Sequence, residues 1–338
     1  MESNKAILIL NWNGEQHLAT FLPSVLAHTP STIDVIVADN GSDDSSLELL
    51  RRDFERVKII EFDRNYGFAE GYNRAMELVE HEFVVLLNSD VEVSAGWCEP
   101  LFEALAADSS LAAVAPKLLS YCDKSSFEYA GAAGGFIDYL GYPFCRGRIL
   151  QTFEQDRGQY DDMRRLFWIS GAAFVCRRSY FREVGGFDAD FFAHMEEIDL
   201  CWRFAMVGYS VAIVPQSTVY HLGGGTLNAS SPRKTELNHR NNLAMLFKCA
   251  PTSQRIVVAV VRPMLDFVAA LSYLIKGEWG NFVAVFKAYR TFFAWHSTLS
   301  KKRRAIRNSR KCEAKHIYRG SIVLRSLFGR RTFGSLKL

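Results

Sequence analysis

The sequence predicts an α/β fold in which helices cover both faces of a mostly parallel sheet. Short apolar runs alternate with helix-length stretches through the first 115 residues, and polar turn residues follow several of the runs. Hydrophobic residues make up 49% of the 338-residue chain, which is enough for a full core. The expected strands are 6–10, 33–38, 57–61, 83–87 and 111–115, and the expected helices are 15–27, 45–54, 69–80 and 97–107.

The middle of the chain is less regular. Residues 117–160 are rich in Gly, Tyr and Asp without a clear period, so we expect loops and short strands that shape a pocket. The apolar stretch 166–176 is broken at Ser170–Gly171. The expected elements that follow are a helix at 196–207, strand-like runs at 211–214 and 218–220, a flexible loop at Gly223–Gly224–Gly225 and a helix at 234–247.

The charge distribution predicts two parts, an acidic domain at 1–250 and a helical basic extension at 251–338. Residues 251–338 contain 18 Lys and Arg against 3 Asp and Glu, a net charge of +15, and the first 250 residues carry −12. Apolar, aromatic helices are expected at 256–275 and 282–295, followed by the basic run 301–304. A basic segment of this kind suits nucleic acid, solvent or anionic lipid; the interleaved aromatic helices favour a lipid surface and not nucleic acid.

Membrane-spanning and secreted classes are not expected. The stretch 256–275 contains Arg262, Pro263 and Asp266, and the apolar run at 6–10 is too short for a signal peptide. Seven scattered cysteines with no CxxC pair are typical of reduced thiols. We therefore expect a cytoplasmic protein that lies peripherally on the inner face of the cell membrane.

The second predicted strand ends at Asp39, which Asn40–Gly41 follows as a turn. A turn with a helix cap explains Gly41 and Ser45, but an acid at the last strand position needs a partner when it is buried. The ribose or base of a nucleotide would be such a partner.

The segment after the third predicted strand contains Asn65, Gly67 and Asn73. Small residues at 67, 69 and 71 allow a ligand or a backbone to approach closely, and the amides of the following helix start favour an anion. The alternative is a glycine-rich connection in which Asn73 is a packed polar group.

Asn88–Ser89–Asp90 follows the buried-strand pattern of 83–87. A carboxylate at that strand end can hold a divalent cation that bridges two phosphates. A simple helix cap is the alternative.

Three acids, Glu196, Glu197 and Asp199, open the predicted helix at 196–207, just after Phe191–Phe192. Acids in a first helical turn suit the helix dipole, and Asp199 with Arg203 is an expected structural i,i+4 pair. A carboxylate beside an aromatic wall can also serve as a general base. Further along, His221 precedes the Gly-rich loop, where it is either a structural histidine or a metal ligand.

Together these segments resemble the inverting family 2 glycosyltransferases with a GT-A fold, especially the bacterial rhamnosyltransferase-like branch. The matching segments span residues 5–245 in family order and also include Asn11-Trp12-Asn13, Ser170–Ala173 and Gly186-Phe187-Asp188. The resemblance implies that Asn11, Asp39, Asn65, Gly67, Asn73, Asn88 and Ser89 bind the nucleotide sugar.

The resemblance also implies a metal site and a base. Asn88–Ser89–Asp90 stands in place of the family's DXD segment without its first acid, which leaves Asp90 and His221 to hold Mg²⁺ or Mn²⁺. The base is implied at Glu197, where family members often have Asp, with Glu196 as the alternative.

The activity implied is transfer of a sugar, with inversion, from a nucleotide-diphosphate donor to a saccharide or lipid-linked saccharide acceptor in cell-envelope polysaccharide synthesis. A nucleotidyltransferase is disfavoured because Asn11-Trp12-Asn13-Gly14 lacks a basic phosphate loop. A catalytically impaired sugar-nucleotide-binding or scaffold protein at the membrane face remains an alternative, because the first acid is missing at Asn88.

Overall fold

The main sheet joins nine strands of the described residues, in the order β11-β13-β6-β12-β4-β1-β2-β3 with β5 paired to β13. The computed structural model describes residues 4–223, 231–327, 329 and 332–336. The strands are β1 (Lys5–Asn11), β2 (Asp34–Asp39), β3 (Lys58–Glu61), β4 (Phe83–Asn88), β5 (Val91–Val93), β6 (Leu111–Ser120), β11 (Arg164–Leu166), β12 (Ala173–Arg177) and β13 (Ser210–His221).

Parallel pairing brings the carboxyl ends of the first strands to one edge. Asn11 at the end of β1 is in register with Asp39 at the end of β2, and Leu10 is in register with Asn88 at the end of β4. The polar residues that the sequence places after these strands therefore meet at the edge where such sheets bind ligands.

Helices cover both faces of this sheet, as predicted. One apolar cluster includes Leu18, Val25 and Leu101 and lies on the side of α1 and α4. The other includes Ala69 and Trp202 and lies on the side of α3 and α6. The helices concerned are α1 (Glu15–His28), α2 (Ser46–Asp53), α3 (Gly67–Leu78), α4 (Glu99–Ala107), α5 (Arg178–Glu183) and α6 (Glu196–Met206).

A second, five-stranded sheet occupies the irregular middle of the chain. Its order is β10-β9-β8-β7-β14, with β7 (Gly135–Asp138), β8 (Pro143–Cys145), β9 (Arg148–Ile149), β10 (Thr152–Phe153) and β14 (Ile317–Tyr318). β14 comes from the C-terminal part of the chain and pairs with β7 in parallel. The C-terminal segment therefore returns to the sheet that flanks the site.

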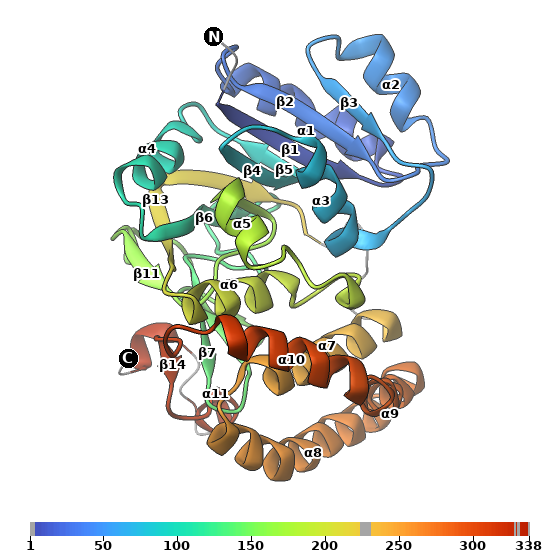
Figure 1. Cartoon of the computed structure of the whole chain (residues 1–338), viewed down its shortest axis with the longest axis vertical. Coiled ribbons are helices and arrows are strands. Elements are labelled where there is room, and N and C mark those ends of the chain that lie inside the picture. The colour runs from blue at the N-terminus through green and yellow to red at the C-terminus, as the bar shows by residue number, and fades with distance from the viewer. Residues whose placement is uncertain (1–3, 224–230, 328, 330–331, 337–338) are drawn as a thin grey trace.

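The basic extension is helical, as predicted, and gathers at the end of the molecule opposite the N-terminal strands (Figure 1). α7 (Pro232–Cys249) leads into α8 (Thr252–Ile275), α9 (Trp279–Ala294), α10 (His296–Ser309) and the short α11 (Ile322–Leu327). The two runs predicted at 211–214 and 218–220 are one strand, β13, with an irregularity in its register between Val214 and Thr218. Gly224 and Gly225 of the predicted loop lie outside the described residues.

Candidate active site

A cavity of about 530 Å³ lies at the carboxyl ends of β1 and β4 and beside the start of α6. Most of the site residues expected from the sequence line it. They are Asn65, Gly67, Asn88, Ser89, Asp90, Glu196, Glu197 and His221. Residues from four separate chain segments thus converge on one cavity.

Asn11 and Asp39 lie behind the cavity wall and do not line it. The Asp39 carboxylate is 1% exposed and accepts hydrogen bonds from Asn11 Nδ2 at 3.0 Å and from the Ser42 amide at 2.9 Å. Ser42 Oγ donates a further bond to it at 2.6 Å. The acid at the strand end therefore has its partners within the protein, and Asn40 and Asn13 are the neighbours that reach the cavity.

Asn73 also lies away from the cavity. Its side chain donates to the Phe187 carbonyl at 2.9 Å and accepts from the Phe187 amide at 2.8 Å. This two-sided bond ties α3 to the loop that precedes α6, so in this structure Asn73 is a packed polar group.

His221 and Asp90 are in direct contact. β5 pairs with the end of β13 and places Val91 opposite His221, which brings His221 Nε2 to 3.2 Å from Asp90 Oδ1. The other ring nitrogen, Nδ1, lies 3.3 Å from Glu128 Oε2. Burial alone would lower the pKa of His221, but the charges of Asp90 and Glu128 raise it to about 10.

The chemistry of this donor set fits a divalent cation. Asp90 and His221 offer a carboxylate oxygen and, once a cation displaces the ring proton, an imidazole nitrogen side by side; both are buried, and both line the cavity. No cluster of three His, Cys, Asp or Glu arranged for a metal occurs among the described residues. A cation there would be bound by these two side chains, and its remaining ligands would come from water or from a bound diphosphate.

The paired acids Glu196 and Glu197 begin α6, after a loop with an unusual backbone. Phe192, His194 and Met195 all have positive φ, between 65° and 71°. The side chain of Asn241, on α7, donates to the carbonyls of Phe191, Ala193 and His194 at 3.0, 2.9 and 2.8 Å. These bonds hold the strained loop in place and thereby fix the start of α6.

The two glutamates differ in access. Glu196 is buried and Glu197 is partly exposed toward the cavity, and each has one buried carboxylate oxygen without a partner among the described residues. Burial raises the pKa of Glu197 to about 7, and burial together with the charge of Glu197 raises the pKa of Glu196 well above its ordinary value. In the same helix Arg203 Nε lies 2.8 Å from Asp199 Oδ2, which confirms the predicted structural pair.

Residue 67 must be glycine because the ring of Phe192 packs directly against its backbone. Its φ is +79°, and a Cβ there would lie 2.4 Å from the ring of Phe192. Asn40 supports the same turn, because its amide donates to the Gly67 carbonyl at 3.0 Å and its oxygen accepts from the Tyr66 amide at 3.0 Å. The glycine at 67 therefore lets the wall of the cavity close against the loop before α6.

Several lining residues were not found from the sequence. Glu128 and Arg148 belong to the stretch without periodicity, where no motif marks them. Arg233 and Lys234 lie in the first turn of α7, where the sequence predicted the start of a helix but no site residue. Trp12 lies inside the Asn11-Trp12-Asn13 motif, and the alternation of a strand end predicts that it faces away from the buried Asn11.

Comparison with known proteins agrees with this architecture. The family model "Glycosyl transferase family 2" matches residues 6–185. The N-acetylglucosaminyl-diphospho-decaprenol L-rhamnosyltransferase of Mycobacterium tuberculosis is 27% identical over 231 residues, which cover 64% of this chain and 75% of the relative. The pre-mycofactocin glycosyltransferase of the same organism is 28% identical over 195 residues, 55% of this chain and 37% of that one.

Solved structures share the fold. GalNAc-T7, crystallised with UDP, GalNAc and Mn²⁺, superposes with a TM-score of 0.58 at 17% identity and covers 77% of this chain, which spans 50% of the neighbour's length. The mannosyltransferase PcManGT from Pyrobaculum calidifontis, in complex with GDP-Man and Mn²⁺, has a TM-score of 0.54 at 13% identity over 98% of this chain and 88% of its own. These neighbours have the GT-A architecture. Because the family model covers more than half of its residues, the chain belongs to glycosyl transferase family 2.

Proposed function

We propose that this glycosyltransferase moves a sugar, with inversion, from a nucleoside-diphosphate sugar to a hydroxyl of a lipid-linked saccharide in cell-envelope polysaccharide synthesis. The observation that carries the proposal is the convergence of Asp90, His221 and Glu197 on one cavity. The mycobacterial relative, named for rhamnosyl transfer to a diphospho-decaprenol-linked sugar, supports the acceptor class and makes rhamnose a candidate donor sugar.

Asp90 and His221 would hold a Mg²⁺ or Mn²⁺ ion, which supplies positive charge to the diphosphate leaving group when it is bound. Asn88, Ser89 and Gly67 line the same part of the cavity and are placed for the donor. Asn11, Asp39 and Asn73 would act on the donor indirectly, by holding Asn40 and the loop before α6 in position.

Glu197 is the proposed base. Its carboxylate takes the proton of the acceptor hydroxyl as that oxygen forms a bond to the anomeric carbon, and the bond from that carbon to the diphosphate oxygen breaks on the opposite face. The products are the glycosylated acceptor, the nucleoside diphosphate and a protonated Glu197. Glu197 is favoured over Glu196 because Glu196 is buried, and burial together with the charge of Glu197 raises its pKa well above the ordinary value.

The chain would work as a catalytic domain, 1–250, with a helical extension, 251–338, that holds it peripherally on the anionic inner face of the cell membrane. A catalytically impaired sugar-nucleotide-binding protein is the second candidate, because Asn88 replaces an acid. Glu197 favours an active enzyme, because it lines the cavity and one of its carboxylate oxygens has no hydrogen-bond partner among the described residues.

The test is transfer from a panel of nucleotide sugars to a lipid-linked saccharide, with Mn²⁺, Mg²⁺ or EDTA, for the wild type and for Glu197→Gln. Metal-dependent transfer that this variant loses, while it still binds the donor, is expected. Donor binding by the wild type without transfer or hydrolysis would select the impaired protein instead.

A further inference from the structure

Helix α8 buries charged and polar side chains and exposes apolar ones, the opposite of an ordinary surface helix. The helix buries the stripe Gln254, Val258, Arg262, Asp266 and Ala270, in steps of four residues. Its outward face is apolar and consists chiefly of Ile256, Val260, Met264, Phe267, Val268, Leu271, Leu274 and Ile275, of which Ile275 is 86% exposed. Between Arg255 and Lys276 the only charged residues are Arg262 and Asp266, and both are buried. Exposure of such a large apolar face to water is unfavourable, and patches of this kind mark interaction sites.

The buried charges fasten α8 to the rest of the protein. Arg262 donates to the Leu140 carbonyl at 2.9 Å and to Asn242 Oδ1 at 2.6 Å. Asp266 accepts from the hydroxyl of Tyr289, on α9, at 2.7 Å and pairs with Arg262 at 3.3 Å. By length and composition α8 is the one helix of the described residues suited to cross a bilayer, but crossing would carry this charged network into hydrocarbon and away from its partners.

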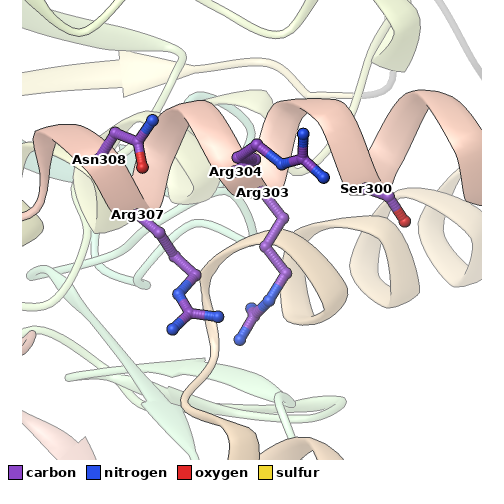
Figure 2. Close-up of a pocket in the computed structure, with 5 residues that line it drawn as sticks. All are labelled: Ser300, Arg303, Arg304, Arg307 and Asn308. Carbon is purple, nitrogen blue, oxygen red and sulfur yellow. The ribbon is translucent and has the colours of Figure 1, made fainter.

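Positive charge lies at both ends of the apolar face. At its start, Arg255 is close enough to the α10 arginines Arg303 and Arg307 for mutual repulsion. These two, with Arg304, border a hollow of about 360 Å³, and none of the described residues that line it is an acid. Figure 2 shows Arg303 and Arg307 projecting from the same side of α10. At the other end lies the exposed Lys276.

Some basic residues of α10 bind other parts of the protein and do not contribute free positive charge at the surface. Lys302 pairs with Asp188 and Asp190, and Arg303 donates to the carbonyls of Phe247, Lys248 and Ala250 at the end of α7. Part of the basic run therefore binds the protein itself. Arg304 and Arg307 are exposed, and Arg307 lies near Arg255 at the start of α8.

The C-terminal end of the apolar face adjoins the active site. Tyr273 shares a side-chain hydrogen bond with Thr235 in the first turn of α7, next to Arg233 and Lys234, which line the cavity. Gly280 packs so closely on Pro232 that a Cβ would lie 2.6 Å from Pro232 Cγ. The start of α9, with the exposed Trp279, thus lies beside the first turn of α7.

We propose that the outward face of α8, together with Trp279, lies in the plane of an anionic bilayer and presents the cavity to a membrane-held acceptor. An apolar helix face flanked by cations and Trp is the pattern of an interfacial helix. The proposal rests on the proposed function only for the acceptor; the lipid contact stands on the helix itself. The main membrane contact is then the apolar face of α8 and not the basic run at 301–304.

The binding test uses the purified full chain and vesicles of phosphatidylcholine with and without phosphatidylglycerol. We expect sedimentation with the anionic vesicles, release by alkaline carbonate, and roughly a tenfold loss of partition for each of Val260→Asp and Val268→Asp. These side chains are 64% and 63% exposed. Leu78→Asp, at a 62% exposed position on α3, is the matched control and should bind as the wild type does.

The outcomes separate this inference from the proposed function. The Val260→Asp, Val268→Asp double variant should keep its melting temperature and its transfer to a short water-soluble acceptor, and should lose transfer to a vesicle-borne one. Unchanged vesicle binding by the double variant, retention after carbonate, or a dimer that the variant dissociates without any vesicle binding would overturn the inference. Vesicle binding by a wild type that transfers no sugar would overturn only the proposed function.

Discussion

His221 Nε2 lies 3.2 Å from Asp90 Oδ1, although the two residues are far apart in the chain. The pairing of β5 with the end of β13 produces this contact, because Val91 is in register with His221. Both side chains are buried and line the cavity, so a substitution of either residue alters the same proposed metal site.

Asp90→Asn should weaken Mn²⁺-dependent binding of a nucleoside diphosphate by at least about a hundredfold, because second-shell changes around a metal already cost about 10–100-fold. Calorimetric titration of the nucleotide with and without Mn²⁺ measures this. Asp53→Asn removes an exposed carboxylate on α2 and is the control. Equal Mn²⁺ dependence in Asp90→Asn and wild type would remove Asp90 from the metal site.

Glu197→Gln should lower kcat by about 10²–10⁴-fold with little change in donor KM, because the general base is lost while the shape of the side chain is kept. Glu196→Gln should change kcat only a few-fold, since an amide resembles the protonated carboxyl that burial and Glu197 favour at that position. Steady-state kinetics of the two variants measure both effects. A larger loss in Glu196→Gln than in Glu197→Gln would exchange their roles.

The rate should depend on pH through Glu197. The base acts when it is deprotonated, and burial raises its pKa to about 7. The ratio kcat/KM should therefore rise about tenfold per unit below pH 7 and level off above it. The same profile for Glu197→Gln should lack this limb; an identical limb in the variant would assign it to another group.

Asn241→Leu should reduce kcat more than donor affinity. Asn241 is fully buried, and its amide supports three carbonyls of the left-handed loop before Glu196. Its loss removes the Asn241 amide from the Ala193 and His194 carbonyls, whereas the Phe191 carbonyl keeps its bonds from Arg240 and from the Ala193 amide. The change frees the start of α6, at a cost of about 1–3 kcal/mol in unfolding free energy. Kinetics and denaturant unfolding are both needed: Asn238→Leu, at another α7 position that lines the cavity, is the comparison. A loss of stability with unchanged kcat would make Asn241 purely structural.

The buried cluster around Lys248 should make folding stability sensitive to acid. Lys248 Nζ lies 2.8 Å from Asp199 Oδ1 and also pairs with Asp188, which Lys302 contacts as well. Burial alone would raise the pKa of Asp188, but the charges of Lys248 and Lys302 hold it well below its ordinary value. A carboxylate with a lowered pKa stabilises the fold above its unfolded pKa of about 3.9 and loses this effect as the pH falls below that.

Lys248→Met leaves two buried acids with less compensation, so it should cost about 3–5 kcal/mol at neutral pH. It should also flatten the loss of stability below about pH 4, because the carboxyl then titrates nearer its ordinary value. Urea unfolding over a pH series measures both. Lys58→Met, which breaks the exposed pair with Asp34, should cost no more than about 1 kcal/mol. Parallel pH curves for Lys248→Met and wild type would contradict the linkage.

Local pattern was sufficient for much of the fold. The apolar runs that became β1, β2, β3, β4 and β6 and the helices between them were predictable because each buries a face whose period is visible in the sequence. That Asn88 and Asp90 reach one sheet edge followed as well, since parallel strands align their carboxyl ends. The second sheet was not predictable in detail, because its strands are two to four residues long and one comes from 317–318.

Tertiary structure decided which polar groups face the cavity. The sequence by itself determined the family resemblance, the order of the acids and the position of the late imidazole. It did not determine that Asp39 turns inward to Asn11, that Glu128 stands beside His221, or that α8 buries its charges and exposes its apolar side. In each case the partner comes from a distant part of the chain, and the period of a segment shows that it has two faces without showing what each face meets.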